Sequence, residues 1–260
     1  MNILLLGDLH GKLPKMPKSG FEAIICTGDY GDDKGIRKVV EKSRKIDKPI
    51  SELITKKKWN ELIKLSREKA KKLIQRLDKK DHTVFTIPGN WDTIPHKRSS
   101  FDSLYLKNTK NIHDCHKIAI ETEEFVIIGY GFCGGPEIDF EAPVRERKKQ
   151  IKEFSALFGH FESLFEHAAD IGKPVIFLSH NAPINSKLDK VRNNDSIMNG
   201  KHVGSMLTRQ LIDAYQPAIC ICGHVHESVG KQKIGKTLVT NCGYQQAWML
   251  DTKKKQVTAL

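Results

Sequence analysis

Five short apolar runs in this chain each end in polar side chains that can bind a metal ion. Continuous apolar runs of this length are typical of strands that are buried on both faces of a sheet. Ligand sites in α/β sheets form beyond the carboxyl ends of the strands, so we expect the five polar ends to converge. The runs are residues 3–6, 23–26, 84–87, 175–178 and 218–222, and they lead to Asp8 and His10, Asp29, Asn90, His180, and His224 and His226.

The residue types at these strand ends predict a metal centre. Asp8 and His10 are two residues apart, as are His224 and His226, so each pair points to one side of an extended backbone. Asp-x-His and Gly-Asn-x-Asp alone are more often turn or cap signals, and Gly-His-x-His alone is a better metal signal, but five motifs together favour a shared site. Carboxylate, amide and imidazole ligands without cysteine suit Mn, Fe, Zn, Ni or Co, with Mg as a further candidate. Seven ligands are too many for one ion, so we expect two divalent ions about 3.5–4 Å apart with a bridging carboxylate.

This constellation resembles the calcineurin-like metallophosphoesterase superfamily. The motifs that carry the resemblance are Asp8-Leu-His10, Gly28-Asp29, Gly89-Asn90-Trp91-Asp92, His180 and Gly223-His224-Val-His226, and they span nearly the whole chain. The resemblance implies an α/β fold, a four-layer αββα sandwich of two mixed β-sheets flanked by helices. It also implies that Asp8, His10, Asp29 and His226 bind the first metal, and that Asn90, His180 and His224 bind the second with Asp29 as the bridge.

Position 91 departs from the family pattern. The commonest residue there is histidine, placed to protonate the leaving alkoxide, and a branch of small prokaryotic phosphodiesterases has cysteine. Trp91 cannot act as a general acid. We therefore consider Trp91 as a substrate-binding residue that stacks on an aromatic group, against the alternative that it packs on its own loop.

Three further residues near these motifs are candidates for catalytic roles. Asn90 is placed to neutralise phosphoryl oxygens as well as to bind metal. Asp92 is expected to orient a site histidine or loop rather than to bind metal. His202 lies in a segment between a loop and a helix that could approach the site, although helix capping explains it at least as well.

The formal net charge of +12 comes from one part of the chain. Residues 34–80 contain 18 Lys or Arg and 6 Asp or Glu, and the remaining residues sum to zero. We call residues 34–80 the basic segment. We expect it to be a helical insertion in a single domain of residues 1–260, and favour a solvated helix face over a nucleic-acid site because Trp59 is its only aromatic residue.

Periodicity predicts the remaining elements. Helical spacing of apolar residues predicts helices over 36–46, over 59–77 and over 144–170, with Ser51 as a cap for a further helix. A helix over 201–215 precedes Pro217, and turn signals delimit short strands at 116–120, 125–130, 225–229, 236–240 and 246–251.

The favoured function is a dimetal-dependent phosphodiesterase that uses a metal-bridging hydroxide on a small or nucleotide-like phosphodiester. The alternatives are a phosphomonoesterase or protein phosphatase, a nuclease or nucleic-acid-binding protein, and a non-catalytic scaffold with the same fold. No apolar run approaches the ~18–20 residues that span a bilayer, and the N-terminal run is too short for a signal peptide. We expect a cytoplasmic protein with a small phosphoester substrate and no membrane partner.

Overall fold

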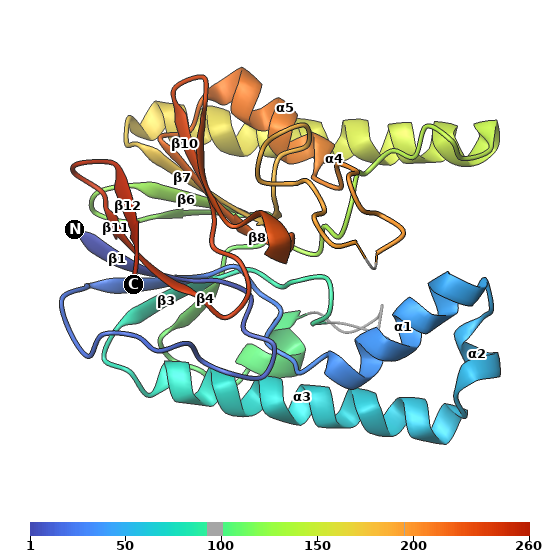
Figure 1. The fold of residues 1–260 in the computed structure, drawn as a ribbon. Coiled ribbons are helices and arrows are strands. Elements are labelled where there is room, and N and C mark those ends of the chain that lie inside the picture. The colour runs from blue at the N-terminus through green and yellow to red at the C-terminus, as the bar shows by residue number, and fades with distance from the viewer. Residues whose placement is uncertain (93–100, 195) are drawn as a thin grey trace.

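The computed structural model describes residues 1–92, 101–194 and 196–260. Two six-stranded mixed β-sheets lie against each other, and helices cover the outer face of each sheet (Figure 1). This arrangement confirms the predicted αββα sandwich.

The first sheet has the strand order β12-β11-β1-β2-β3-β4. Strands β1 to β4 are parallel to one another, and β11 and β12 are antiparallel additions at the other edge. Their bounds are β1 Asn2–Leu6, β2 Ala23–Cys26, β3 Thr83–Thr86, β4 Ile112–Asp114, β11 Ala247–Asp251 and β12 Gln256–Ala259.

The second sheet has the order β5-β6-β7-β8-β10-β9. Its four central strands are parallel, and the edge strands β5 and β9 are antiparallel to their neighbours. The bounds are β5 Ala119–Glu121, β6 Val126–Tyr130, β7 Val175–Asn181, β8 Ile219–Gly223, β9 Gly230–Ile234 and β10 Thr237–Asn241.

The helices divide between the two outer layers. Helix α3 lies along the first sheet, while α4 and α5 cover the second, and α1 and α2 extend past the carboxyl ends of the strands (Figure 1). The bounds are α1 Lys34–Ile46, α2 Ile50–Leu53, α3 Lys56–Asp78, α4 Val144–Ile171 and α5 Met206–Tyr215, with a π-helix η1 Asp102–Leu106 and a 3-10 helix η2 His226–Ser228.

Alternation within β1 shows how the layers are built. Ile3 and Leu5 are buried between the two sheets, whereas Leu4 and Leu6 face the layer that contains α3. Burial of each such side chain contributes about 1.5–3 kcal/mol, so a strand of this kind is stable only with a layer on both faces. The carboxyl ends of the parallel strands in both sheets lie on the same side of the molecule, because residues that follow β1, β2 and β8 and residues at the end of β7 contact one another there.

Four local predictions were wrong or incomplete. The predicted strand 225–229 is the helix η2, and β9 begins only at Gly230, because the backbone turns sharply at His224. Ser51 lies inside α2, and it is Thr55 whose hydroxyl caps α3 by accepting the N–H of Lys58. The predicted helix 201–215 begins only at Met206. Strands β4 and β12 were not predicted, because neither Ile-His-Asp nor Gln-Val-Thr-Ala contains a run of apolar residues.

The other predicted helices and strands lie within a few residues of their observed positions. Among the described residues, none of the helices has the length and apolar character to cross a bilayer.

Candidate metal centre

The ends of five strands bring the predicted ligands into two groups. The first consists of Asp8, His10 and His226, and the second of Asp29, His180 and His224. Within each group, one ligand atom from each residue lies within 4.8 Å of the other two. The seventh predicted ligand, Asn90, contacts both histidines of the second group.

Three of these residues have a left-handed backbone that is unfavourable for residues other than glycine. The φ angles are 40° at His10, 50° at Asp29 and 64° at His224. Hydrogen bonds hold each one: the N–H of His10 donates to the Asp29 carbonyl (2.7 Å), and the N–H of His224 donates to Oδ2 of Asp8 (2.6 Å). The N–H of Asp29 donates to Oδ2 of Asp92 (2.8 Å). Backbone strain is thus concentrated where the ligands are presented.

Glycines beside the ligands allow the strand ends to approach one another closely. Gly28 has a φ of 101°, and a Cβ there would lie 2.4 Å from the backbone nitrogen of Gly89. A Cβ on Gly223 would lie 2.2 Å from Oδ1 of Asp8. Any larger residue at these positions would displace the ligand loops.

In the first group, ring nitrogens and a carboxylate oxygen face one another. Nε2 of His226 lies 3.3 Å from Nε2 of His10 and 3.2 Å from Oδ2 of Asp8. Nδ1 of His10 lies 3.0 Å from Oδ1 of Asp33, which favours a proton on that nitrogen and leaves the lone pair on Nε2. The His10 lone pair is therefore directed into the group.

In the second group, backbone carbonyls fix the histidine tautomers. Nδ1 of His180 donates to the carbonyl of Thr27 (2.8 Å), and Nε2 of His224 donates to the carbonyl of Gly134 (3.1 Å). The remaining nitrogen of each ring then has a lone pair, and each lies 2.9 Å from Oδ1 of Asn90. Oδ1 of Asn90 and the two ring nitrogens are thus three acceptors that face one another without a hydrogen atom between them. A bound cation would satisfy all three.

Asp29 lies between the two groups. Its Oδ1 accepts the N–H of Trp91 (2.9 Å), while its Oδ2 is 3.6 Å from Nε2 of both His10 and His180. One carboxylate oxygen thus faces a histidine from each group. This is the position that a carboxylate bridging two ions would occupy.

The pKa shifts follow from burying acids and bases together. Burial, aided by repulsion from Asp8 and Asp92, raises the pKa of Asp29 well above its usual value. Burial also opposes ionisation of Asp8, but attraction to His180 and the hydrogen bond from His226 outweigh it and lower the pKa of Asp8. Burial lowers the pKa of His224 to about 3, so its ring is neutral and available as a ligand near pH 7.

These observations fit two divalent cations. The donors are two carboxylates, an amide oxygen and four imidazoles, the lone pairs converge on two points, and one carboxylate is shared. Such a donor set matches borderline divalent ions rather than the all-oxygen environment of Ca²⁺.

Asp92 binds the backbone of two ligand loops rather than a histidine. Its carboxylate accepts the N–H groups of Asp29, Tyr30 and Gly89, each at 2.8 Å. Of the two roles considered from the sequence, its contacts match the orientation of a loop.

Trp91 and His202 have other neighbours. The Trp91 ring is half-buried, and the Cζ atom of Arg37 lies 5.8 Å from its centre, which is a cation–π distance. Nδ1 of His202 lies 2.7 Å from Oδ1 of buried Asp189. In the described part of the chain, no recorded contact joins His202 to the seven predicted ligands, so its catalytic role stays a prediction.

Sequence reasoning missed Asp33, Arg37 and Tyr244. Asp33 contacts His10 and forms an ion pair with Arg37 (2.6 Å), and the Tyr244 ring stacks on His10 with 5.2 Å between ring centres. Asp33 occupies the N-cap position of α1, where an aspartate is ordinarily explained by capping. A second aspartate four residues after Asp29 was the available signal.

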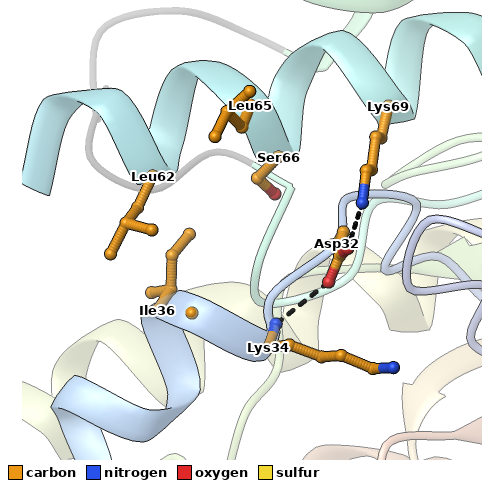
Figure 2. A pocket seen from close by; sticks show the side chains of 8 residues that line it. Asp32, Lys34, Ile36, Leu62, Leu65, Ser66 and Lys69 are labelled. Carbon is orange, nitrogen blue, oxygen red and sulfur yellow. Dashed lines mark hydrogen bonds and ion pairs between the residues drawn. The ribbon is translucent and has the colours of Figure 1, made fainter.

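A pocket of about 210 Å³ lies beside the centre, between α1 and α3. Apolar side chains from both helices line it, and Asp32 at its edge accepts the N–H of Lys34 (3.1 Å) and pairs with Lys69 of α3 (Figure 2). None of the predicted ligands lines it. The ion pair between Asp32 and Lys69 at the edge of this pocket connects the segment before α1 to α3.

The sequence is similar to known proteins. The family model described as calcineurin-like phosphoesterase matches residues 1–228. An uncharacterized protein of Methanocaldococcus jannaschii is 28% identical over 264 residues, which cover 99% of this chain and 94% of that protein.

A crystal structure at 18% identity shares the fold, with a TM-score of 0.65 over 100% of this chain and 98% of its own. Another, described as a novel archaeal phosphodiesterase, has 13% identity and a TM-score of 0.40, with coverage of 100% of this chain and 99% of its own.

Proposed function

Because the chain belongs to the calcineurin-like phosphoesterase family, we propose that it is a dimetal-dependent phosphodiesterase acting on a small or nucleotide-like phosphodiester. The observation that carries this proposal is the shared position of Asp29 between two groups of metal-competent side chains. A scaffold without catalytic activity would have no need to keep strained backbone at three ligand positions.

Two bound divalent ions would supply a water of lowered pKa as the nucleophile and would neutralise charge on the phosphoryl oxygens. The protein residues hold this arrangement in place. Asp8, His10 and His226 would bind the first ion, and His180, His224 and Asn90 the second, with Asp29 shared. Thr27, Gly134 and Asp33 keep the ligand lone pairs pointing inward through the tautomers that they impose.

Asp92 supports the site from behind. Three backbone N–H groups converge on its carboxylate, so the loop after β2 and the loop after β3 are held at a fixed separation. This fixes Asp29 relative to Asn90, which belong to these two loops. Alignment of ligands to within a fraction of an ångström is what catalysis by positioned groups requires.

The preference for diesters rests on Trp91. Histidine is the commonest family residue at this position, and the indole cannot give a proton to a leaving alkoxide. Enzymes of this superfamily that hydrolyse monoesters usually keep that histidine. We therefore favour a diester over a monoester as the substrate.

The test is metal reconstitution followed by a substrate comparison. Purified protein is stripped with a chelator and reloaded with Mn²⁺, Ni²⁺ or Mg²⁺, and a chromogenic phosphodiester is compared with the matching monoester. We expect two metal ions per chain and a higher kcat/KM for the diester. Equal or faster monoester hydrolysis would remove the diester preference. No hydrolysis of either substrate with two ions bound would overturn the enzymatic function.

A further inference from the structure

Three cations of the basic segment, Arg37, Arg67 and Lys80, are half-buried, and Arg37 is the one that contacts the surroundings of the candidate metal centre. Of its 18 Lys and Arg residues, 15 are exposed, but Arg37 is half-buried and turned toward the candidate metal centre. Its side chain is 37% exposed, while that of its partner Asp33 is 3% exposed. A guanidinium that is partly desolvated in this way interacts more strongly than a surface lysine.

Arg37 is connected to the first ligand group through Asp33. Nε of Arg37 donates to Oδ2 of Asp33 (2.8 Å) and Nη2 forms an ion pair with the same oxygen (2.6 Å), while Oδ1 of Asp33 lies 3.0 Å from Nδ1 of His10. One carboxylate therefore fixes a ligand histidine on one side and a guanidinium on the other. The geometry ties the orientation of Arg37 to that of the centre.

Trp91 gives the guanidinium a second support. The Trp91 ring lies under Cζ of Arg37, and the Trp91 N–H holds Oδ1 of Asp29, the shared carboxylate. The guanidinium thus rests on a residue that itself contacts the middle of the site. The ion pair between Asp32 and Lys69 fastens the start of α1 to α3, which limits how far Arg37 can move away (Figure 2).

The N-terminus of α1 shows that this arrangement has a cost. Asp33 occupies the N-cap position but makes no capping hydrogen bond with its side chain, although an aspartate cap stabilises a helix by about 1 kcal/mol. Its carboxylate is used for His10 and Arg37 instead. The stabilisation that a capping hydrogen bond would give α1 is therefore absent, and the Asp33 carboxylate contacts His10 and Arg37 in its place.

In the part of the chain that the structure describes, the Arg37 guanidinium has N–H donors without a protein acceptor. A guanidinium has five N–H donors, of which Nε–H donates to Asp33, and Nη2 forms an ion pair with the same carboxylate. Within residues 1–92, 101–194 and 196–260, the structure shows no protein acceptor for Nη1. A half-exposed donor pair beside a metal centre is suited to an anionic oxygen, and guanidinium groups bind phosphate oxygens with matching geometry.

We propose that Arg37 is a substrate-binding residue of this centre, whose free amino group donates to a phosphoryl oxygen of the phosphodiester. Asp33 and Trp91 are positioning residues that hold the guanidinium for this contact. The inference rests on the proposed phosphoesterase function and adds one residue from the basic segment to its site. It also gives Trp91 a role that differs from direct stacking on the substrate.

The first experiment compares two charge-removing variants on the same helix. Arg37→Gln and Lys38→Gln each remove one positive charge, but Lys38 is exposed. Both are reloaded to two ions per chain, and binding of inorganic phosphate is measured by calorimetry, together with kcat/KM for a chromogenic diester. We expect Arg37→Gln to weaken phosphate binding by about 10- to 100-fold, the range for a charge-assisted hydrogen bond. Lys38→Gln should stay within about twofold of wild type, and Arg37→Lys should fall between the two.

The outcomes separate this proposal from the broader one. If the wild type hydrolyses the diester and Arg37→Gln binds phosphate like Lys38→Gln, Arg37 is not a substrate ligand. If Arg37→Gln instead loses metal ions, its role is structural and the inference is likewise overturned. If the reloaded wild type neither binds phosphate nor hydrolyses either ester, the proposed function fails and this inference with it.

A second pair of variants tests the positioning role of Trp91. Trp91→Phe keeps an aromatic face under Arg37, whereas Trp91→Ala removes it. We expect Trp91→Ala to raise KM and weaken phosphate binding by about 3- to 10-fold, with a smaller change in kcat and with metal content unchanged, and Trp91→Phe to restore most of the loss. Equal phosphate affinities in wild type and Trp91→Ala would refute the positioning role.

Discussion

The strand ends around Asp29 and the basic segment of residues 34–80 differ in how far their charged side chains are exposed to solvent. Around Asp29, the charged side chains are buried, and each has partners at short distance. In the basic segment, most charges are exposed and their ion pairs lie at the surface, as with Lys58 and Glu61 at 3.4 Å. Surface pairs of this kind contribute little, whereas a buried charge without its partner is strongly unfavourable.

This difference shows why net charge is a poor guide to function in this chain. The +12 comes from residues that are mainly solvated, while the candidate chemistry lies in the part whose formal charges sum to zero. Arg37 is the exception, because it belongs to the basic segment but contacts Asp33 and Trp91 next to the candidate ligands. The comparison therefore predicts large effects for buried charges and small ones for exposed charges.

The largest effect is expected at Asp29. In Asp29→Ala, both groups lose the shared carboxylate, so we expect kcat/KM to fall by at least about 1,000-fold and bound metal to drop below two ions per chain. Activity assays and elemental analysis measure the two quantities. Glu61→Gln on α3 is the control and should change neither. Retained activity in Asp29→Ala would mean that the site is misplaced.

Asp33 should have the next largest effect, because it contacts both regions through His10 and Arg37. Asp33→Asn keeps the shape but weakens the contacts to His10 and Arg37, and outer partners of ligand histidines typically change activity or metal affinity by about 10- to 100-fold. Titration of metal-free protein with Mn²⁺, followed by activity, measures both. Glu52→Gln, which removes an exposed acid of the basic segment that pairs with Lys48, is the control and should lose less than about threefold. Similar losses in both variants would break the link between the two regions.

The parts of the site that could be predicted from the sequence are those that depend on residues close together in the chain. Asp8, Asp29 and His180 could be predicted to converge because apolar runs specify parallel strands and each residue comes directly after or at the end of one. The αββα layering was implied by the family resemblance, whereas the apolar runs by themselves indicated only strands that are buried on both faces. These features are properties of short stretches of sequence.

The contacts of the basic segment could not be predicted in the same way. Whether Arg37 points at Trp91 or at solvent depends on the rotation of α1, which is set by packing against α3 and by Asp33. Alternation predicted a strand over 225–229, but Asp8 accepts the N–H of His224 and holds the backbone there in a left-handed turn, so tertiary contacts override the pattern. Long-range partners of this kind leave no periodic signal.

A smaller effect is expected from a half-buried neutral histidine away from the centre, His116. Nδ1 of His116 accepts the N–H of Gly131 (2.9 Å), and burial lowers the pKa of His116 to about 4. Between pH 6.5 and 4 the unfolded chain therefore binds a proton that the folded chain does not, so stability falls as the pH decreases. We expect His116→Asn to reduce this loss by roughly 1–3 kcal/mol.

Urea unfolding of wild type and His116→Asn at pH 7 and pH 4.5 measures this difference. Both proteins are used without metal, so that proton competition at the ligands is the same in each. Parallel pH profiles for the two proteins would show that His116 does not titrate in this range.

The smallest effect is expected from exposed lysines at the start of α3. Lys56, Lys57 and Lys58 are all exposed, and replacing them by glutamine removes three charges. A solvated helix face predicts less than about a twofold change in kcat/KM for a small diester, because screening at ~0.15 M salt limits such charges to a range of about 8 Å.

The same triple variant tests the nucleic-acid alternative. If the basic segment bound a nucleic-acid backbone, each lost phosphate contact would reduce the slope of log K against log salt by about 0.7–0.9. We expect no salt-sensitive gel shift of a single-stranded oligonucleotide by the wild type, because the segment lacks interleaved aromatic residues on which bases could stack. A shift that the triple variant abolishes would instead make the exposed charges part of the substrate site. Exposed charges would then contribute to function as buried charges do, and burial would no longer distinguish functional charges from solvated ones.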